Sequence, residues 1–156
     1  MRILFVCLGN ICRSPAAEAA LRDALAEAGL ADSVEVDSAG TGDWHIGEPP
    51  DPRMVAAAAE AGLTLRGRAR LVTREDFETA DLILVMDRAN LADVRALAPD
   101  DAARDKVRLF REFDDGADGD EVPDPYFGGP EGFAEVVDIV RAAARGLVRH
   151  LVEAGV

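Results

Sequence analysis

Short apolar runs alternate along this chain with longer segments in which apolar residues recur every three or four positions. Residues 3–6 and 82–86 are uninterrupted apolar runs, which are typical of central parallel strands covered on both faces. Residues 34–38 alternate between apolar and polar side chains, as in a strand, and residues 107–110 form a weaker candidate. The pattern therefore predicts four strands.

Helical periodicity marks four further segments, each with a proline or an aspartate near its start. These predicted helices cover residues 15–28, residues 51–61, residues 87 to about 97, and roughly two dozen residues from about 130 onward. Residues 111–130 are rich in Gly, Asp and Pro and are predicted to form a long loop, which in a compact domain is usually functional. The alternation predicts an α/β fold, a four-stranded parallel open sheet with helices on both faces.

Composition narrows the class of protein. With 156 residues, 49% of them apolar and 30% charged, the chain is expected to form a single domain over residues 1–156. Its net charge of −13 repels nucleic acid and anionic membrane surfaces, so neither is expected as a partner. The apolar run near the N-terminus ends at Gly9, too early for a signal peptide. Only two cysteines occur, Cys7 and Cys12, which favours a cytoplasmic location over a disulfide scaffold.

The stretch Cys-Leu-Gly-Asn-Ile-Cys-Arg-Ser-Pro, from Cys7 to Pro15, lies between the first predicted strand and the first predicted helix. Ligands of open α/β sheets bind at this edge. A thioredoxin-type pair has two residues between its cysteines, and zinc would require further clustered ligands, whereas His45 and His150 are isolated. A Walker-type loop would require Gly-Lys-Ser/Thr, which is absent. The remaining interpretation is a loop that binds an anion.

The spacing of Cys7 and Arg13 suits this chemistry. The intervening residues allow the backbone N–H groups to converge on one centre, at the positive end of the helix that follows. Arg13 would offer a planar fork to two phosphate oxygens, and the same positive field would favour a thiolate on Cys7. A nucleophile beneath a bound oxyanion implies phosphoryl transfer to sulfur. If the cysteines were merely buried apolar residues, Gly9, Asn10 and Ser14 would have no explanation.

The stretch from Cys7 to Pro15 resembles the phosphate-binding loop of the low-molecular-weight protein tyrosine phosphatases almost letter for letter. Asp124-Pro125-Tyr126 is similar to the general-acid loop of that family, and the resemblance spans essentially the whole chain. It implies a flavodoxin-like fold of the phosphatase I type. It also implies hydrolysis of phosphotyrosine proteins or small aryl phosphates through a cysteinyl-phosphate intermediate, without a metal or other cofactor.

The resemblance also implies a role for each matched side chain. Cys7 would be the nucleophile, Arg13 would bind the phosphate and its transition state, and Asp124 would act as general acid and then as general base. Ser14 would form a hydrogen bond with the Cys7 sulfur. The residues implied to bind phosphate or to support the loop are Leu8, Gly9, Asn10, Ile11, Cys12, Ser14 and Ser38.

The residues around Asp124 and Asp87 bear on the role of each aspartate. Pro123 and Pro125 stiffen the loop around Asp124, which suits a side chain that must hold its position over a cleft. A simple turn is the alternative for an isolated Asp-Pro pair, but the presence of Cys-x5-Arg favours the acid. Asp87 fits a helix cap and support of the active site equally well.

Three other residues are assigned by the resemblance with alternatives left open. Trp44 and Tyr126, the single tryptophan and the single tyrosine, would form the walls of the substrate cleft, although Trp44 could instead pack within its loop. Cys12 either packs the loop or guards Cys7 by forming a reversible disulfide under oxidation. The sequence does not indicate the oligomeric state.

Several features bear on the rival functions. Residues 66–70 lack the histidine that many relatives carry there, and Phe127 replaces the second of two tandem tyrosines. Arsenate reductase on the same fold would require cysteines downstream of Cys12, and the protein-arginine phosphatase branch carries threonine at the position of Ile11. A binding module that only holds a phosphorylated ligand would need neither Cys7 nor a general acid. Phosphotyrosine hydrolysis is therefore the preferred function.

Overall fold

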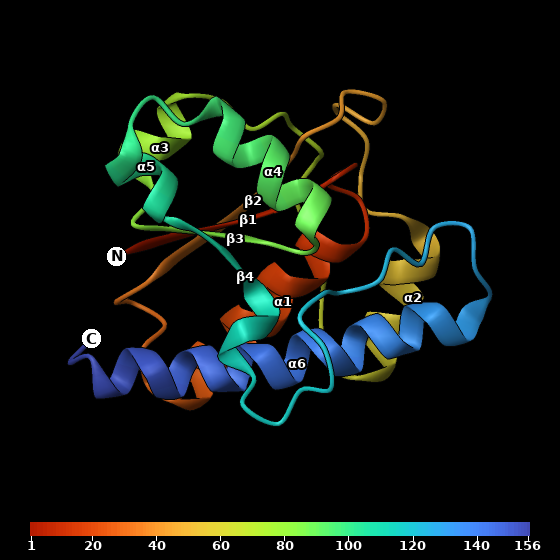
Figure 1. Cartoon of the computed structure of the whole chain (residues 1–156). Helices are drawn as coiled ribbons and strands as arrows, with labels where there is room; N and C mark the ends of the chain where they lie inside the picture. The colour runs from red at the N-terminus through yellow and green to blue at the C-terminus, as the bar shows by residue number, and fades with distance from the viewer.

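The fold is built on a four-stranded, all-parallel sheet with strand order β2-β1-β3-β4, seen edge-on in Figure 1. The computed structural model describes residues 1–156. The two uninterrupted apolar runs form the central strands, which must be buried on both faces. The strands are β1 (Arg2–Cys7), β2 (Glu35–Gly40), β3 (Leu82–Val85) and β4 (Val107–Leu109).

Helices connect the strands and follow the last one. The four predicted helices are present, and the first of them begins at Arg13, before Pro15. Three short elements were not predicted, because segments of four or five residues carry too little periodicity to be recognised. The helices are α1 (Arg13–Glu27), α2 (Pro52–Glu60), α3 (Glu75–Thr79), α4 (Arg88–Leu97), α5 (Asp101–Asp105), the 3-10 helix η1 (Phe110–Phe113) and α6 (Pro130–Glu153). The predicted loop over 111–130 is therefore shorter, because η1 includes residues 111–113.

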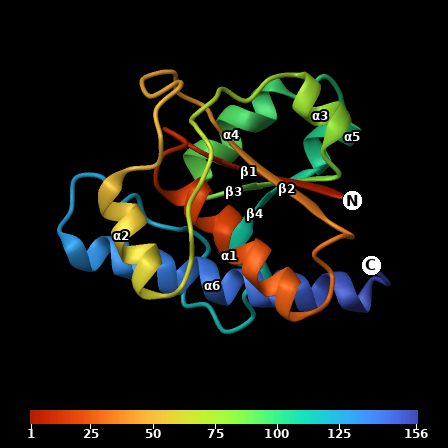
Figure 2. The same ribbon diagram turned by 180° about the vertical axis from the view of Figure 1, so that it is seen from behind.

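The helices cover both faces of the sheet, which confirms the predicted fold class. Figures 1 and 2 show α1 and α6 on one face and α3, α4 and α5 on the other. Alternate residues of β1 divide between the two cores: Ile3 and Phe5 enter the larger cluster of 32 buried residues. Leu4 and Val6 enter a smaller cluster of 11. No helix is both long and apolar enough to span a membrane.

The carboxyl ends of the central strands bring distant parts of the chain together. Strand β1 ends at Cys7 and α1 begins at Arg13, so the residues between them form a loop at this edge. Asp87 follows β3 at the same edge. The backbone N–H of Val122 donates to the carbonyl oxygen of Met86 at 2.7 Å, which fixes the loop after η1 against the end of β3. Asp124 reaches this edge for that reason.

Candidate active site

The loop between β1 and α1 turns sharply at Asn10, the only residue other than glycine with a positive φ, 57°. Its side chain stabilises this uncommon conformation. The Asn10 amide nitrogen Nδ2 donates to Ser14 Oγ at 2.8 Å and to Ser38 Oγ at 3.0 Å. Its Oδ1 accepts from the backbone N–H of Arg70 at 3.0 Å. Asn10 therefore links the loop to α1, to β2 and to the segment that pairs with the end of β2.

The Cys7 sulfur lies at the base of this loop and is 3% exposed. Ser14 Oγ lies 3.0 Å from the sulfur, and the backbone N–H of Asn10 donates to it at 3.3 Å. Ser14 Oγ accepts from Asn10 Nδ2, so its own proton is available either to the sulfur at 3.0 Å or to the carbonyl oxygen of Ala39 at 3.5 Å. When Ser14 donates to the sulfur together with the Asn10 backbone, the arrangement suits a thiolate nucleophile.

Arg13, at the first position of α1, is 3% exposed and is held from two sides. Its Nη1 donates to Asp87 Oδ2 at 2.6 Å and to the carbonyl oxygen of Val122 at 3.1 Å. The other oxygen of Asp87 accepts from the backbone N–H of Asn90 at 2.8 Å, as the N-cap of α4. Asp87 thus caps α4 and also binds the Arg13 guanidinium, the two contacts that the roles considered for it require.

Asp124 lies across the cleft from the loop, and its side chain is 42% exposed. Its Oδ2 is 3.6 Å from Arg13 Nη2, while its Oδ1 accepts from the backbone N–H of Tyr126 at 3.1 Å. This Asx turn fixes the carboxyl group relative to the backbone. The loop after η1 thus brings a carboxylate next to Arg13.

Arg53, which the sequence did not single out, ties the Asp124 loop to the Cys7 loop. Its Nη1 donates to the carbonyl oxygen of Tyr126 at 3.0 Å, and its guanidinium lies 5.2 Å from the centre of the Tyr126 ring. Its Nη2 donates to Asp51 Oδ2 at 2.8 Å, and these hydrogen bonds lower the pKa of the Asp51 carboxyl. The backbone N–H of Asp51 donates in turn to the carbonyl oxygen of Ile11 at 2.9 Å.

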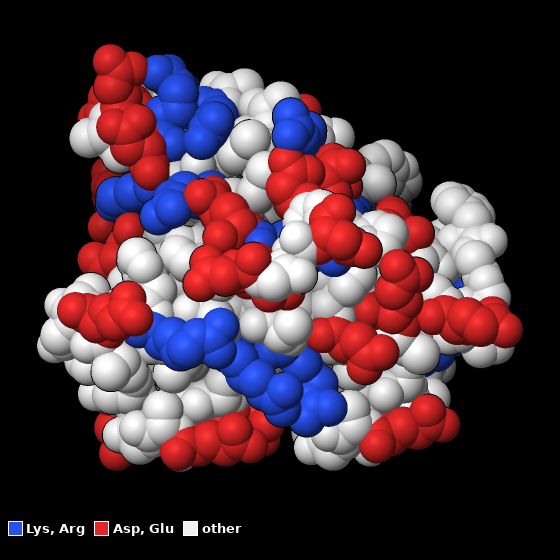
Figure 3. All heavy atoms as spheres, turned by 60° about the horizontal axis from the view of Figure 1, so that its bottom comes forward, with Lys and Arg blue, Asp and Glu red and all other residues white.

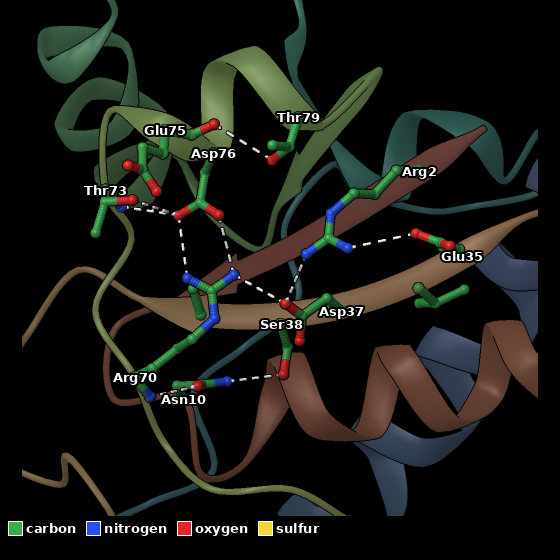
Figure 4. Close-up of polar contacts among 12 residues, drawn as sticks. Arg2, Asn10, Glu35, Asp37, Ser38, Arg70, Thr73, Glu75, Asp76 and Thr79 are labelled. Atoms are coloured by element: carbon green, nitrogen blue, oxygen red, sulfur yellow. Dashed lines mark hydrogen bonds and ion pairs between the residues drawn. The ribbon is translucent and has the colours of Figure 1, made fainter.

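A second supporting cluster lies behind the loop and is drawn in Figure 4. The Arg70 guanidinium donates to Asp37 at 2.9 Å and to both oxygens of Asp76 at 3.0 and 3.1 Å. Burial alone would raise the pKa of the Asp76 carboxyl, but hydrogen bonds from Arg70 and Thr73 outweigh burial and leave that pKa lowered. These pairs hold Arg70, whose backbone N–H holds Asn10. No sequence signal connects residues so far apart in the chain.

A cleft of about 390 Å³ opens above Cys7. Its wall is apolar and its base is polar, so it offers space for a ring that carries an anionic group at one end. Its lining residues are Cys7, Leu8, Gly9, Ile11, Cys12, Arg13, Trp44, His45, Asp124, Tyr126 and Phe127. The structure therefore brings most of the predicted site residues into one cleft. The exceptions are Asn10, Ser14 and Ser38, which support the loop from behind.

The cleft lining includes Phe127 and His45 in addition to the predicted Trp44 and Tyr126. Trp44 is 67% exposed and lines the cleft, and its ring also lies against the backbone of Gly42 in its own loop, so both interpretations considered for it describe part of its surroundings. Phe127 packs edge-on against Tyr126 with ring centres 4.9 Å apart. His45 also lines the cleft, where its Nδ1 lies 2.6 Å from Glu48 Oε2. From the sequence, His45 beside Trp44 fitted either the rim of the cleft or simple exposure, with exposure preferred, and the structure places it in the cleft lining.

Cys12 differs chemically from Cys7 although the same cleft contains both. Burial raises the pKa of the Cys12 thiol to about 12, and the negative charges of Asp51 and Cys7 act in the same direction. Cys12 is therefore protonated at neutral pH and is a poor nucleophile in the resting protein. Both cysteines are free thiols.

Comparison with known proteins gives one consistent family. Residues 2–155 match the model of the family described as low molecular weight phosphotyrosine protein phosphatase. A low molecular weight protein-tyrosine-phosphatase of Streptomyces coelicolor is 48% identical over 97% of this chain and 96% of its own length. A crystal structure of a protein tyrosine phosphatase from Entamoeba histolytica superposes with a TM-score of 0.96 at 37% identity. It covers 100% of this chain and 99% of its own.

An arginine phosphatase is also among the similar structures. The YwlE arginine phosphatase, in a mutant with a phosphorylated active-site serine, superposes with a TM-score of 0.87 at 32% identity. The alignment covers 98% of this chain and 97% of that one. The fold alone therefore does not separate a phosphotyrosine from a phosphoarginine substrate.

Proposed function

The chain belongs to the low molecular weight phosphotyrosine protein phosphatase family, and on this premise we propose that Cys7, Arg13 and Asp124 carry out its reaction. The protein is a hydrolase of the protein-tyrosine-phosphatase class. The observation that supports the assignment most strongly is that all three side chains line one cleft, with Arg13 3.6 Å from Asp124. Residues 1–156 would act as a single catalytic domain.

In the first step the Cys7 thiolate attacks the phosphorus of the bound ester. The new bond between sulfur and phosphorus forms as the bond between phosphorus and the phenol oxygen breaks. Asp124, in its protonated form, donates a proton to the departing oxygen, so the product leaves as a neutral phenol. The enzyme is left with a cysteinyl-phosphate and an Asp124 carboxylate.

In the second step water attacks the cysteinyl-phosphate. The Asp124 carboxylate takes a proton from this water, the bond between phosphorus and sulfur breaks, and inorganic phosphate forms. The Cys7 thiolate and the protonated Asp124 are restored. The hydrogen bonds from Ser14 and from the Asn10 backbone stabilise the sulfur each time it becomes negative.

Arg13 and the loop backbone would stabilise the transferred phosphoryl group. Its charge is spread over three equatorial oxygens in the transition state, and preorganised N–H donors interact with this charge without reorganising. Asp87 holds the guanidinium through Nη1 and leaves other N–H groups free for phosphate oxygens. The N-terminus of α1 adds the positive end of its helix dipole.

The cleft walls support an aromatic leaving group. Trp44 and Tyr126 offer flat faces to a phenyl ring, and Ile11 lines the cleft with an apolar side chain. An apolar lining favours the ring of phosphotyrosine over the hydrogen-bonding guanidinium of phosphoarginine. Phosphotyrosine proteins and small aryl phosphates are therefore the proposed substrates.

The two cysteines also bear on where the enzyme works. The reaction requires Cys7 as a free thiolate, which a reducing cytoplasm maintains. If oxidation formed a disulfide with Cys12, Cys7 would be protected from further oxidation until reduction restored it. Because the Cys12 thiol has a raised pKa, we expect this disulfide to form slowly.

The proposal is tested by the substrates that the purified enzyme hydrolyses in the presence of a chelator. We expect turnover of p-nitrophenyl phosphate and of a phosphotyrosine peptide, and no turnover of the matched phosphoserine peptide. Matched phosphoarginine peptide and arsenate reduction serve as the tests of the two rival activities. Faster hydrolysis of phosphoarginine than of phosphotyrosine would overturn the substrate assignment.

A further inference from the structure

Three arginines one turn apart form a basic stripe along α6. Arg145 and Arg149 are exposed, Arg141 is partly exposed, and none of the three forms an ion pair with a carboxylate. Figure 3 brings the α6 side of the molecule forward and shows Lys and Arg atoms in a continuous stripe across it. We call these three residues the arginine ridge.

The ridge differs from the rest of the surface. The chain has a net charge of −13, and most of its other arginines are bound by nearby carboxylates. Those with such a partner are Arg2, Arg13, Arg22, Arg53, Arg70, Arg88, Arg104, Arg108 and Arg111. Like charges one turn apart also destabilise a helix. The ridge thus concentrates positive charge that no carboxylate of the chain neutralises in an ion pair.

The ridge is separate from the catalytic cleft. None of its residues lines the cleft, which lies at the carboxyl ends of the strands. Helix α6 instead runs along the outside of the larger core, packed against α1 and η1. Its arginines therefore do not take part in binding the phosphate that reacts.

We propose that the arginine ridge is a docking surface for an acidic segment of a partner protein. The ridge extends about 12 Å, from the rise of eight residues along a helix, and an extended peptide spans that length with about four residues. A run of Asp, Glu or phosphorylated side chains would complement its charge and pair with the guanidinium forks.

The surroundings of the ridge favour a narrow partner over a flat one. Figure 3 shows Asp and Glu atoms around the stripe, and α6 itself carries Glu135, Asp138 and Glu153. A membrane surface or a duplex would approach these carboxylates together with the arginines and be repelled. Asp138 precedes Arg141 by three residues and Glu153 follows Arg149 by four, so these carboxylates lie at the ends of the ridge. A short acidic segment confined to the three arginines meets fewer carboxylates than a flat surface does.

The proposal is tested with a fluorescein-labelled peptide that contains a run of about six glutamates, enough to span the ridge. Binding is measured by fluorescence anisotropy to the full chain, with the same peptide carrying glutamine in place of glutamate as the control. We expect binding of the glutamate peptide alone, weakening steeply as salt is raised and the charges are screened.

Two triple variants with the same net charge locate the binding. Arg141→Gln, Arg145→Gln and Arg149→Gln together should weaken binding about tenfold or more, as expected from the loss of three exposed ion pairs. The matched control replaces Arg66, Arg74 and Arg104 with glutamine. These three arginines are exposed on other parts of the surface, so binding should be unchanged. Both variants should hydrolyse p-nitrophenyl phosphate at the normal rate, which also shows that they fold.

Several outcomes would overturn the proposal. Equal loss of binding in the two triple variants would mean that only net charge matters. Binding of vesicles containing phosphatidylserine, or of duplex DNA, in preference to the peptide would assign the ridge to another class of partner. Ridge-dependent self-association in sedimentation velocity would identify the acidic partner as a second copy of this chain.

Discussion

Asp124 is the side chain that we propose as the proton donor to the leaving group. Replacing it with alanine removes the proton donor, so kcat for a phosphotyrosine peptide should fall about 10²–10⁴-fold. The decrease should be smaller for p-nitrophenyl phosphate, whose phenolate leaves more readily without a proton. Steady-state kinetics with both substrates measures the difference. Equal decreases for the two would remove Asp124 from the role of general acid.

Arg53 is a second residue whose replacement should lower activity, and we expect it to do so through the groups that it binds. It holds the carbonyl oxygen of Tyr126 and the Asp51 carboxylate at once, so Arg53→Met should loosen the loop that carries Asp124. We expect kcat for phosphotyrosine to fall about tenfold with little change in KM, since a loss of positioning affects the transition state more than the ground state.

The control for Arg53 is Arg108→Met. Arg108 also pairs with a carboxylate and lies over an aromatic ring, that of Phe113, but it is not part of the cleft. The Arg108→Met substitution should therefore leave kcat unchanged. If Arg53→Met loses the limb of the pH–rate profile that reports a protonated general acid, Arg53 positions Asp124. An equal loss of activity in Arg53→Met and Arg108→Met would indicate only general damage.

Among the elements, α6 and η1 approach so closely that one glycine is required between them. A Cβ atom on Gly146 would lie 1.9 Å from the carbonyl oxygen of Phe113, which is backbone and has little freedom to move. Gly146→Ala should therefore destabilise the protein by about 1–3 kcal/mol, although alanine favours a helix by about 1 kcal/mol over glycine. Urea unfolding measures this change.

Gly132→Ala is the matched control in the same helix. Its added Cβ would meet Pro125 at 3.7 Å, an ordinary contact, so the helix propensity of alanine should leave stability unchanged or raise it. A stabilised Gly146→Ala variant would contradict the close packing of η1 on α6.

The apolar pattern of the sequence predicted the central strands but not every helix or loop contact. The runs at 3–6 and 82–86 identified the central strands correctly because a strand buried on both faces has no polar position. The short helices α3, α5 and η1 escaped prediction because each is about one turn long. The hydrogen bond from Val122 to Met86 also could not be read from the sequence, because it joins two loops through the folded backbone.

The candidate site likewise contains residues that the sequence indicated and residues that it did not. Cys7 and Arg13 were singled out because their residue types and spacing carry a recognisable chemistry, and Asp124 because its loop resembles the general-acid loop of the family; all three line the cleft. Arg53 and Arg70 were missed because their importance lies in what they contact: Arg53 holds a backbone carbonyl, and Arg70 holds Asn10 through its own N–H. An arginine with carboxylates nearby is common at protein surfaces, so the sequence alone gave no reason to choose these two.

At the scale of the whole molecule, the ion pair between Arg70 and Asp76 makes the free energy of unfolding depend on pH. The pKa of Asp76 is lowered in the folded protein, so its ion pair stabilises the fold above the unfolded pKa of about 4 and is lost as the pH falls through the folded value. Asp76→Asn should cost about 1–3 kcal/mol at pH 7. The difference from the parent chain should shrink below about pH 4.

Urea unfolding of both chains across this pH range measures the effect. Glu18, whose pKa is raised by burial, is present in both chains and cancels in the difference. A difference that stays constant from pH 7 to strongly acidic solution would show that the charge of Asp76 does not stabilise the fold.

The whole account depends on a covalent bond between Cys7 and phosphate. The most direct test mixes the enzyme with excess p-nitrophenyl phosphate, quenches the reaction in acid within milliseconds and determines the intact mass and the modified peptide. In the parent enzyme we predict one added phosphoryl group, located on Cys7, and we predict no measurable turnover by Cys7→Ser. Turnover by Cys7→Ser at the parent rate, or phosphate trapped in the parent enzyme on a residue other than Cys7, would contradict the mechanism.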